Sequence, residues 1–387
     1  YPTSDLVTAP DIIFFWVARM IMAGYEYCDK MPFKNVYFTG IVRDKLGRKM
    51  SKSLGNSPDP LVLIEKYGAD GVRMGMMLSA PAGNDILFDE ALCEQGRNFN
   101  NKIWNALRLI KGWQVVDCEQ SECNKLSIQW FEEKLKQTIV EINDDFSKYR
   151  ISDALMLVYK LFWDEFSAWY LEMIKPAYQQ PIDKVTYEKT IEFFEILMQL
   201  LHPFMPFITE EIWHILKDRT EDDCIMISQL PNVDGFNGSV ISDINIVKEI
   251  IVGIRTIRKE KNIPFKDAIT LAVKGNHNDL YNSMIIKMGN ISNIEKSEVS
   301  GISMSYMVGT SEYSVVLNEN IDVEAEVKKI ESEIEYLKGF LASVMKKLNN
   351  EKFVANAKPE IVEMERKKQA DAESKIKSLT ENLNKLK

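Results

Sequence analysis

The chain has 387 residues, with 57 acidic and 48 basic side chains and a formal net charge of −9. Its content of 45% hydrophobic and 27% charged residues is that of an ordinary globular protein, and its length allows about two or three domains with cores of their own. The acidic balance excludes a uniformly basic nucleic-acid binder, although local basic patches can oppose an acidic average.

No stretch of the sequence predicts a membrane span or a signal peptide. The apolar run at 12–23 is too short to cross a bilayer and is interrupted by Arg19. The five cysteines form no CxxC pair. We therefore expect reduced thiols, a cytoplasmic location and no protein-bound metal.

Residues 1–95 show an α/β pattern. The apolar run 12–23 predicts a buried helix, and the β-branched and aromatic run 36–42 predicts a strand. The turn residues 57–60 should open a helix at 61–67, and a further helix is expected at 72–79.

From residue 98 to residue 217 the apolar spacing is helical throughout, which predicts a helical bundle. One of its helices should cover 187–201, and Thr209 should open the next, with acidic residues near its start. The aromatic stripes at 162–170 and 194–213 are typical of a core. A platform for unstacked bases is the alternative.

Residues 240–320 predict a small α/β unit. A helix is expected at 246–261 and strands at 269–273 and 313–317. The helix carries a basic cluster made of Arg255, Arg258, Lys259 and Lys261.

The tail predicts an antiparallel coiled coil. Apolar residues alternate spacings of four and three between Val323 and Leu348, and again from Ala372 to Leu386. The polar stretch 349–359 should reverse the chain, with Pro359 starting the second helix. At 1.5 Å per residue the first arm would reach roughly 40 Å.

The most informative stretch is Lys49-Met50-Ser51-Lys52-Ser53, the signature loop, which follows a turn at 44–47. Two flexible cations beside hydroxyl groups and glycines suit the neutralisation of a triphosphate as its leaving group departs. An ordinary solvated basic loop is the alternative, and the full five-residue string argues against it.

This string resembles the signature loop of class I aminoacyl-tRNA synthetases. The segments 11–20 and 201–213 and the coiled-coil tail resemble the valyl-tRNA synthetases within that class, and the likeness covers nearly the whole chain. It implies ATP as a substrate, Mg²⁺ arriving with the ATP, valine, and a valine-specific tRNA as partner.

The resemblance also implies roles for individual residues. Lys52 would contact the ATP phosphates with support from Lys49, Ser51 and Ser53 would fix the loop around Met50, and Asp11 would reach the ATP ribose. A helix N-cap before Ile12 is the alternative for Asp11. Where the family has glycine two residues before this aspartate, the chain has Ala9, which puts the nucleotide contact in question.

Trp16 would line the amino-acid pocket, with a core tryptophan as the alternative. A pocket for valine discriminates against one methylene or an isosteric hydroxyl by only about 1–3 kcal/mol, and the family therefore carries a separate editing domain.

Two parts of the family are missing from the sequence. There is no His-x-Gly-His motif, and no segment remains for the editing domain. We therefore expect the chain, which begins at Tyr1, to be the C-terminal portion of a synthetase, with half of the active site and no ability to activate valine alone.

Contacts with tRNA are expected at two places. Arg97, Lys102 and Arg108 should lie on a helix that borders two domains, where a solvated polar face is the alternative. The coiled-coil tip is basic and resembles a tRNA-binding arm, with a solvated coiled-coil surface as the alternative. Its candidate contacts are Lys346, Lys347, Arg366 and Lys367.

The combined prediction is a multidomain, monomeric chain. Its parts are the α/β second half of a Rossmann-like class I catalytic core (1–95), an all-α anticodon-binding bundle (96–235), a small α/β linker unit (236–318) and an antiparallel coiled-coil arm (319–387). Two rivals remain. One is an isoleucyl- or leucyl-specific fragment, and the other is a non-catalytic RNA-binding or scaffolding protein that dimerises through its coil.

Overall fold

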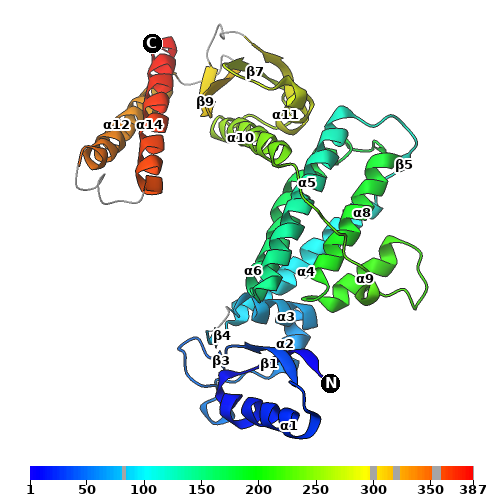
Figure 1. Cartoon of the computed structure of the whole chain (residues 1–387). Coiled ribbons are helices and arrows are strands. Elements are labelled where there is room, and N and C mark those ends of the chain that lie inside the picture. The colour runs from blue at the N-terminus through cyan, green and yellow to red at the C-terminus, as the bar shows by residue number, and fades with distance from the viewer. Residues whose placement is uncertain (81–83, 297–302, 317–322, 351–358, 387) are drawn as a thin grey trace. The chain divides into compact units, whose positions relative to one another are not determined.

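The computed structural model describes residues 1–80, 84–296, 303–316, 323–350 and 359–386 (Figure 1). The chain divides into two compact units, Tyr1–Gly238 and Ser239–Lys387. Within the described ranges no helix combines the length and the apolar character needed to cross a membrane.

The first unit opens with a β–helix–β segment. Strand β1 (Thr3–Thr8) pairs in parallel with β2 (Phe33–Phe38). The chain between them forms a 3₁₀ turn, a π-helical segment and a helix, which are Pro10–Ile12, Ile13–Val17 and α1 (Ala18–Cys28). The helical prediction for 12–23 is therefore confirmed in outline.

The predicted burial of this segment is wrong. Val17 is buried, but Phe14 is 86% exposed, Trp16 57% and Met22 70%. An apolar run predicts that a surface is covered, but it does not predict which part of a protein covers it.

The predicted strand 36–42 is interrupted near Gly40. After β2 ends at Phe38, β3 (Val42–Arg43) pairs in parallel with β4 (Ile86–Leu87). A Cβ on Gly40 would lie 1.7 Å from the carbonyl oxygen of Asn84, so only glycine allows this approach.

Two short helices follow the signature loop. They are α2 (Pro60–Tyr67) and α3 (Ala69–Leu78). The predicted helix 61–67 is confirmed, with Asp59 as its N-cap accepting a hydrogen bond from the Leu61 amide. The helix predicted at 72–79 is present and begins earlier, at Ala69.

A helical bundle forms the rest of the first unit, as predicted. Its helices are α4 (Glu90–Lys111), α5 (Glu122–Ser147), α6 (Ile151–Lys160), a π-helical continuation (Leu161–Tyr170), α7 (Leu171–Ile174), α8 (Lys184–Leu201) and α9 (Pro206–Leu216). Phe131, Phe166 and Tyr170 are buried, with ring centroids 4.9–5.5 Å apart. Phe162 and Phe194 are buried as well, so these members of the aromatic stripes belong to the core.

The bundle has short strands and a turn at its loops. Strand β5 (Val115–Val116) pairs in parallel with β6 (Ile182–Asp183), and a 3₁₀ turn covers Ile225–Ile227. The β5–β6 pair joins the loop after α4 to the loop before α8.

The start of α9 differs from the prediction. The helix begins at Pro206 rather than at Thr209, and its first amides are capped from α3. The Asp70 carboxylate accepts hydrogen bonds from the backbone N–H of Phe207 (3.3 Å) and Ile208 (2.7 Å). Because this cap comes from far away in the sequence, local spacing could not reveal it.

The second unit contains a four-stranded sheet and two further helices. The sheet order is β8 (Ile291–Glu295), β7 (Ile269–Lys274), β10 (Ser311–Val316), β9 (Ser303–Val308), with β7–β8 parallel and the other pairs antiparallel. The helices are α10 (Gly238–Glu260) and α11 (Asn282–Gly289), the latter preceded by the 3₁₀ turn Asp279–Tyr281. The two predicted strands are confirmed within the described residues, and β8 and β9 were not predicted.

A helical hairpin completes this unit. Helices α12 (Val323–Leu348) and α14 (Pro359–Leu386) pack on each other, and Pro359 begins the second helix as predicted (Figure 1). The buried apolar residues Ile330, Ile334, Val344 and Ala372 fall on the predicted seam. Most of the predicted reversal at 349–359 lies outside the described residues.

Candidate functional site

The signature loop is built on a buried carboxylate. Asp44, at the start of the turn after β3, accepts hydrogen bonds from the backbone N–H of Leu46 (3.0 Å) and Arg48 (2.8 Å). The Arg48 side chain donates to its other oxygen, and residues 43 and 49 form an antiparallel bridge. Gly47, at φ +76°, closes the turn in a conformation that favours glycine.

Asn56 connects this turn to the signature string. Its Nδ2 donates to the Asp44 carboxylate (3.0 Å) and to the carbonyl oxygen of Lys49 (3.2 Å). Its Oδ1 accepts from the backbone N–H of Ser51 (2.9 Å). One amide side chain therefore holds both ends of the first half of the string.

The second half of the string is a capped helical turn. Ser51 is the N-cap of the 3₁₀ turn Lys52–Leu54, and its Oγ accepts from the Leu54 amide (3.2 Å). The Ser51 and Ser53 hydroxyls lie 3.1 Å apart. The two serines thus fix the backbone that carries Lys52.

These hydrogen bonds change the acidity of Asp44. The Asn56 amide, with further bonds from Arg48 and Leu46, lowers the pKa of the Asp44 carboxyl to about 2. The carboxylate is therefore ionised over the whole range in which the loop would work.

Two lysines of the loop are left available. Arg43, Lys45 and Arg48 form ion pairs with Asp85, Asp89 and Asp44 respectively. Lys49 and Lys52 are exposed, and neither has an ion-pair partner within the part of the chain that the structure describes. The arrangement presents two unneutralised ammonium groups on a rigid backbone, which suits a polyanionic ligand.

Asp11 lies inside the 3₁₀ turn Pro10–Ile12, whose N-cap is Ala9, and no side chain caps it. The N-cap alternative for Asp11 is therefore wrong. Asp11 is exposed and makes no hydrogen bond to any described residue.

Trp16 is more than half exposed, so in this chain it is not a core tryptophan. No hydrogen bond or ion pair between described residues joins Asp11 or Trp16 to the signature loop. The structure therefore presents these residues at a surface without bringing them into contact with the loop.

The predicted tRNA-contacting residues of α4 have protein partners. Arg97 forms an ion pair with Glu94 (3.1 Å), and its guanidinium lies 5.6 Å from the Tyr67 ring centroid. The Lys102 ammonium lies 5.4 Å from the Trp163 ring. Arg108 is exposed in the last turn of α4, so of the three it is the most available to a ligand.

The predicted cations of the hairpin differ from one another. The Lys347 ammonium lies 3.6 Å from the buried Glu365 carboxylate, which Lys368 also contacts at 2.7 Å. Lys346, Arg366 and Lys367 are exposed and have no ion-pair partner among the described residues. Lys347 therefore has a role inside the hairpin, whereas the other three face solvent.

A cavity at the β5–β6 end of the bundle was not predicted. It has a volume of about 430 Å³ and lies between the loop after α4 and the loop before α8. Tyr178 is 89% exposed beside it. The side chains that line it include an indole, a phenol, amides and an ammonium, from Trp113, Gln114, Lys175, Tyr178, Gln179 and Gln180. Only the combination of aromatic and amide residues in both loops could have indicated this in the sequence.

A second unpredicted feature links α3 to the loop between α8 and α9. The Arg73 guanidinium donates to the carbonyl oxygens of Pro203 and Phe204, both at 3.0 Å. Together with the Asp70 cap of α9, this fixes the segment after the signature loop to the bundle. Burial raises the pKa of Asp70 and lowers that of His202 nearby.

Within the described ranges, no group of three or more His, Cys, Asp or Glu side chains is placed to hold a metal ion. None of the cysteines Cys28, Cys93, Cys118, Cys123 and Cys224 forms a disulfide in the described structure.

Three protein families match successive parts of the chain. Residues 1–89 match tRNA synthetases class I (I, L, M and V), residues 129–273 match the anticodon-binding domain of tRNA ligase, and residues 322–387 match the valyl tRNA synthetase tRNA binding arm.

Curated relatives match along the whole chain. It is 64% identical to a valine–tRNA ligase of Parabacteroides distasonis over 99% of its length, and 64% identical to one of Phocaeicola vulgatus over 100%. It is 39% identical to the valine–tRNA ligase of Fusobacterium nucleatum over 99% of its length. The chain spans 44–45% of the length of these relatives.

Two solved structures are similar over part of the chain. The LeuRS of Agrobacterium radiobacter K84, in a ternary complex with tRNA and LeuAMS, gives a TM-score of 0.47 at 18% identity, over 62% of this chain and 29% of that one. The methionyl-tRNA synthetase of Mycobacterium tuberculosis gives 0.44 at 19% identity, over 61% and 50%. These scores are too low to support an argument about the fold. The three family matches and the identity along the whole chain make this chain similar throughout to a portion of the class I valyl-tRNA synthetases.

Proposed function

We propose that this chain supplies the signature loop and the tRNA-binding parts of a valine–tRNA ligase. The whole enzyme would join valine to ATP with release of pyrophosphate, then transfer the valine to its tRNA in the cytoplasm. The observation that carries the proposal is the pair Lys49 and Lys52, both exposed and without ion pairs among the described residues, on a loop fixed by Asp44 and Asn56.

The chemistry of the loop follows from its charges. Negative charge builds up on the departing pyrophosphate, and two positioned ammonium groups stabilise it more in the transition state than in the ground state. Lys52 would contact the phosphates, with Lys49 supporting it and Mg²⁺ accompanying the ATP. Asp11 would reach the ribose, and Trp16 would line the valine pocket, both from a surface that the rest of the enzyme covers.

The remaining parts would bind tRNA. We propose the bundle, residues 96–235, as the anticodon-binding domain, with the 430 Å³ cavity near Trp113 and Gln180 as the place where an unstacked base is read. Aromatic faces and amides in one cavity are the groups that single-stranded bases require. The hairpin, residues 319–387, would be an antiparallel coiled-coil arm that contacts the tRNA backbone, and the unit 236–318 would link the two in a monomer.

The catalytic proposal is tested in a chimera. The chain replaces the matching segment of the Parabacteroides distasonis ligase, and valine-dependent pyrophosphate exchange is measured. Lys52→Ala should lower the rate by ~10²–10³-fold, as for the loss of one transition-state donor. Lys45→Ala is the matched control, because Lys45 is exposed but paired with Asp89. Equal rates for the two variants would overturn the assignment of Lys52.

The isolated chain provides two further tests. It should show no pyrophosphate exchange, and valine-dependent exchange by the chain alone would contradict the proposed division of the active site. It should bind valine tRNA in preference to isoleucine and leucine tRNAs at low and moderate salt. Equal binding of all three would mean that the chain contacts only the RNA backbone. Sedimentation should give a monomer, because the hairpin pairs with itself.

A further inference from the structure

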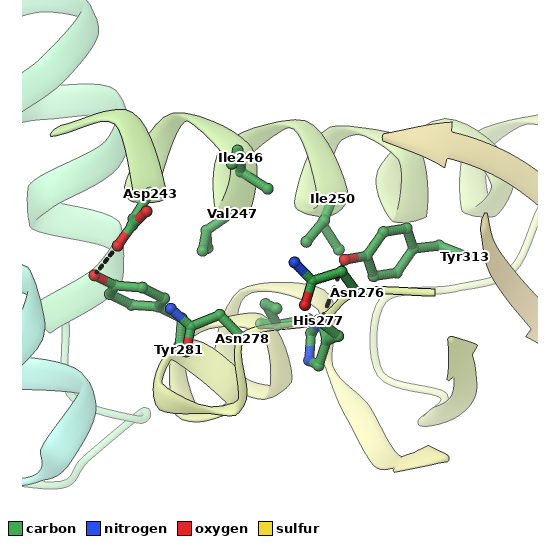
Figure 2. A pocket seen from close by; sticks show the side chains of 10 residues that line it. Asp243, Ile246, Val247, Ile250, Asn276, His277, Asn278, Tyr281 and Tyr313 are labelled. Carbon is green, nitrogen blue, oxygen red and sulfur yellow. Dashed lines mark hydrogen bonds between the residues drawn. The ribbon is translucent and has the colours of Figure 1, made fainter. Parts of the chain in front are cut away.

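The small α/β unit contains a cavity of its own, of about 210 Å³ (Figure 2). It lies between α10, the loop after β7 and the start of α11. Val247, Ile250 and Ile285 give it an apolar floor, all three of them buried. Asp243 stands at one end of the cavity, on α10.

His277 and Tyr313 form a fixed wall. The Nε2 of His277 lies 2.6 Å from the Oδ1 of Asn282, which can only accept, so Nε2 carries the proton. In the neutral imidazole Nδ1 then accepts from the Tyr313 hydroxyl at 3.1 Å. Both ring nitrogens of His277 are therefore engaged in hydrogen bonds within the protein. These bonds fix the orientation of the ring in the absence of a ligand.

Tyr281 orients the carboxylate of Asp243. Its hydroxyl donates to Oδ2 of Asp243 at 3.1 Å (Figure 2). Burial, with the nearby Asp243 charge, raises the pKa of Tyr281 to about 12, so the hydroxyl stays a donor. Oδ1 of Asp243 has no hydrogen-bond partner among the described residues and remains an acceptor.

Two amides complete the set of available polar groups. The Asn276 side chain makes no hydrogen bond to a described residue. Asn278 uses its Oδ1 to accept from the Leu280 amide, which leaves its Nδ2 as a donor. Above an apolar floor, the cavity thus offers a carboxylate acceptor, amide N–H donors and an amide oxygen acceptor.

We propose that this cavity binds a nucleobase that carries an exocyclic amino group. The flat face of the base would lie on the apolar floor, its amino group would donate to Asp243, and its ring nitrogens and carbonyl would meet the two asparagines. The volume is below the ~300–1,000 Å³ typical of pockets for drug-sized ligands, which fits a single base better than a whole nucleotide.

The amides also argue against a simple cation site. An ammonium ion needs only acceptors, so it would make no use of the amide donors of Asn276 and Asn278. The base could come from a free nucleoside or from an unstacked residue of an RNA strand. The RNA source rests on the proposed function, whereas the free nucleoside does not.

The experiment uses the whole chain with ¹³C-labelled Ile and Val methyl groups, observed by NMR during titration. Guanosine and inosine form a matched pair, because inosine lacks the amino group, and cytidine and uridine form a second. Guanosine or cytidine should shift the methyl signals of Val247, Ile250 and Ile285. The nucleoside of the same pair that lacks the amino group, inosine or uridine, should bind at least tenfold more weakly. Asp243→Asn should remove this discrimination.

Further variants keep the test decisive. Asn276→Ala changes an exposed side chain without a hydrogen bond to described residues, so it should weaken binding and leave the fold intact. Glu249→Gln and Asn245→Ala change exposed residues of the same helix outside the cavity and should have no effect.

The outcomes separate the two sources. Binding of nucleosides supports the proposal with a free ligand. If nucleosides fail but valine tRNA shifts the same methyl signals, and Asp243→Asn and Asn276→Ala abolish the shift, the base comes from RNA. Absence of shifts with both probes overturns the proposal, and so does equal binding of spermidine. A tRNA that does not bind the chain at all contradicts the proposed function instead, and the nucleoside titration still decides the cavity.

Discussion

At the scale of single residues, two side chains outside the signature string give it its shape. Asp44 collects four hydrogen bonds in the turn, and Asn56 joins that turn to Lys49 and Ser51. The string predicts that the loop binds phosphates, and this stays a prediction. It could not predict these two supports, because their roles depend on the backbone path around them.

The first prediction concerns Asn56. Replacing it by alanine frees the Ser51 amide and the Lys49 carbonyl, so Lys52 loses its fixed position. In the chimera, pyrophosphate exchange should fall by about tenfold, the effect of one lost positioning contact of ~1.4 kcal/mol. Ser57→Ala changes an exposed neighbour and should leave the rate unchanged. A similar loss in both variants would show that the loop is merely sensitive to any change.

The second prediction concerns acid. Because the pKa of Asp44 is lowered to about 2, its ionised form stabilises the turn fully above about pH 4, the usual value for a free aspartate. This contribution is lost as the pH falls through 2. The protection factors of the Leu46 and Arg48 amides, taken relative to intrinsic exchange, should therefore hold from pH 5 to 4 and fall progressively as pH approaches 2. Loss of protection already above pH 4 would contradict the structure of the turn.

The third prediction concerns Arg258. Its guanidinium is buried and donates to the carbonyl oxygens of Gly289, Pro264, Asp267 and Asn290 at 2.9–3.1 Å. Of the four residues of the basic cluster predicted on this helix, Arg258 is therefore a buried one. Arg258→Ala removes the guanidinium donors of these carbonyls and should lower the free energy of unfolding by about 3 kcal/mol or more. Urea unfolding measures this.

Lys259 provides the control for that measurement. It is exposed on the same helix, so Lys259→Ala should change the free energy of unfolding by less than about 0.5 kcal/mol. If both variants change the free energy of unfolding equally, the hydrogen bonds of Arg258 do not stabilise the unit as its contacts indicate.

At the scale of elements, helices with regular apolar spacing could be predicted, and elements defined by distant partners could not. The spacing at 187–201 gave α8 to within three residues at its start. Strands β8 and β9 were missed because short strands acquire their stability from sheet neighbours, here β7 and β10. The true start of α9 depends on Asp70, which lies 138 positions from Ile208.

The fourth prediction tests how closely two elements approach. Helices α3 and α4 cross at glycines, and a Cβ on Gly96 would lie 2.4 Å from the Gly71 carbonyl oxygen. Gly96→Ala should therefore destabilise the first unit by about 1–3 kcal/mol through overpacking. Gly339→Ala in α12 meets no atom within 4 Å. It should instead stabilise the second unit by about 0.5–1 kcal/mol, since alanine is the better helix former. Thermal unfolding, followed separately for each unit, gives the sign of each change in stability. A change of the same sign in both variants would contradict the close approach of α3 and α4.

At the scale of the whole molecule, the exposed apolar surface and the family matches point the same way. Phe14, Trp16 and Met22 are exposed in the segment that follows β1, and the chain spans less than half the length of its curated relatives. The apolar composition of this segment predicted burial, but these three side chains are largely exposed in this chain. The exposure of Asp11 and Trp16 agrees with the roles proposed for them in a chain that matches only part of its relatives.

The proposed RNA association would be a property of the whole molecule, because its net charge of −9 opposes any polyanion. Binding then depends on where the unpaired cations lie. On the hairpin, Lys346, Arg366 and Lys367 are exposed and without ion pairs among the described residues, whereas Lys347 faces the buried Glu365. The first three are the residues to remove, since loss of Lys347 would also disturb the contact between the helices.

The fifth prediction is the salt dependence of that association. Each phosphate contact contributes about 0.7–0.9 to the slope of log K against log salt concentration. Replacing Lys346, Arg366 and Lys367 by alanine should therefore reduce the slope for valine tRNA by about 2–3 and weaken binding. The matched control removes three exposed lysines elsewhere on the same two helices, Lys338, Lys375 and Lys377. If the arm contacts RNA at its tip, the control should keep most of the slope. An equal fall in both triple variants would mean that only the total charge matters, and an unchanged slope in both would remove the hairpin from the RNA-binding surface.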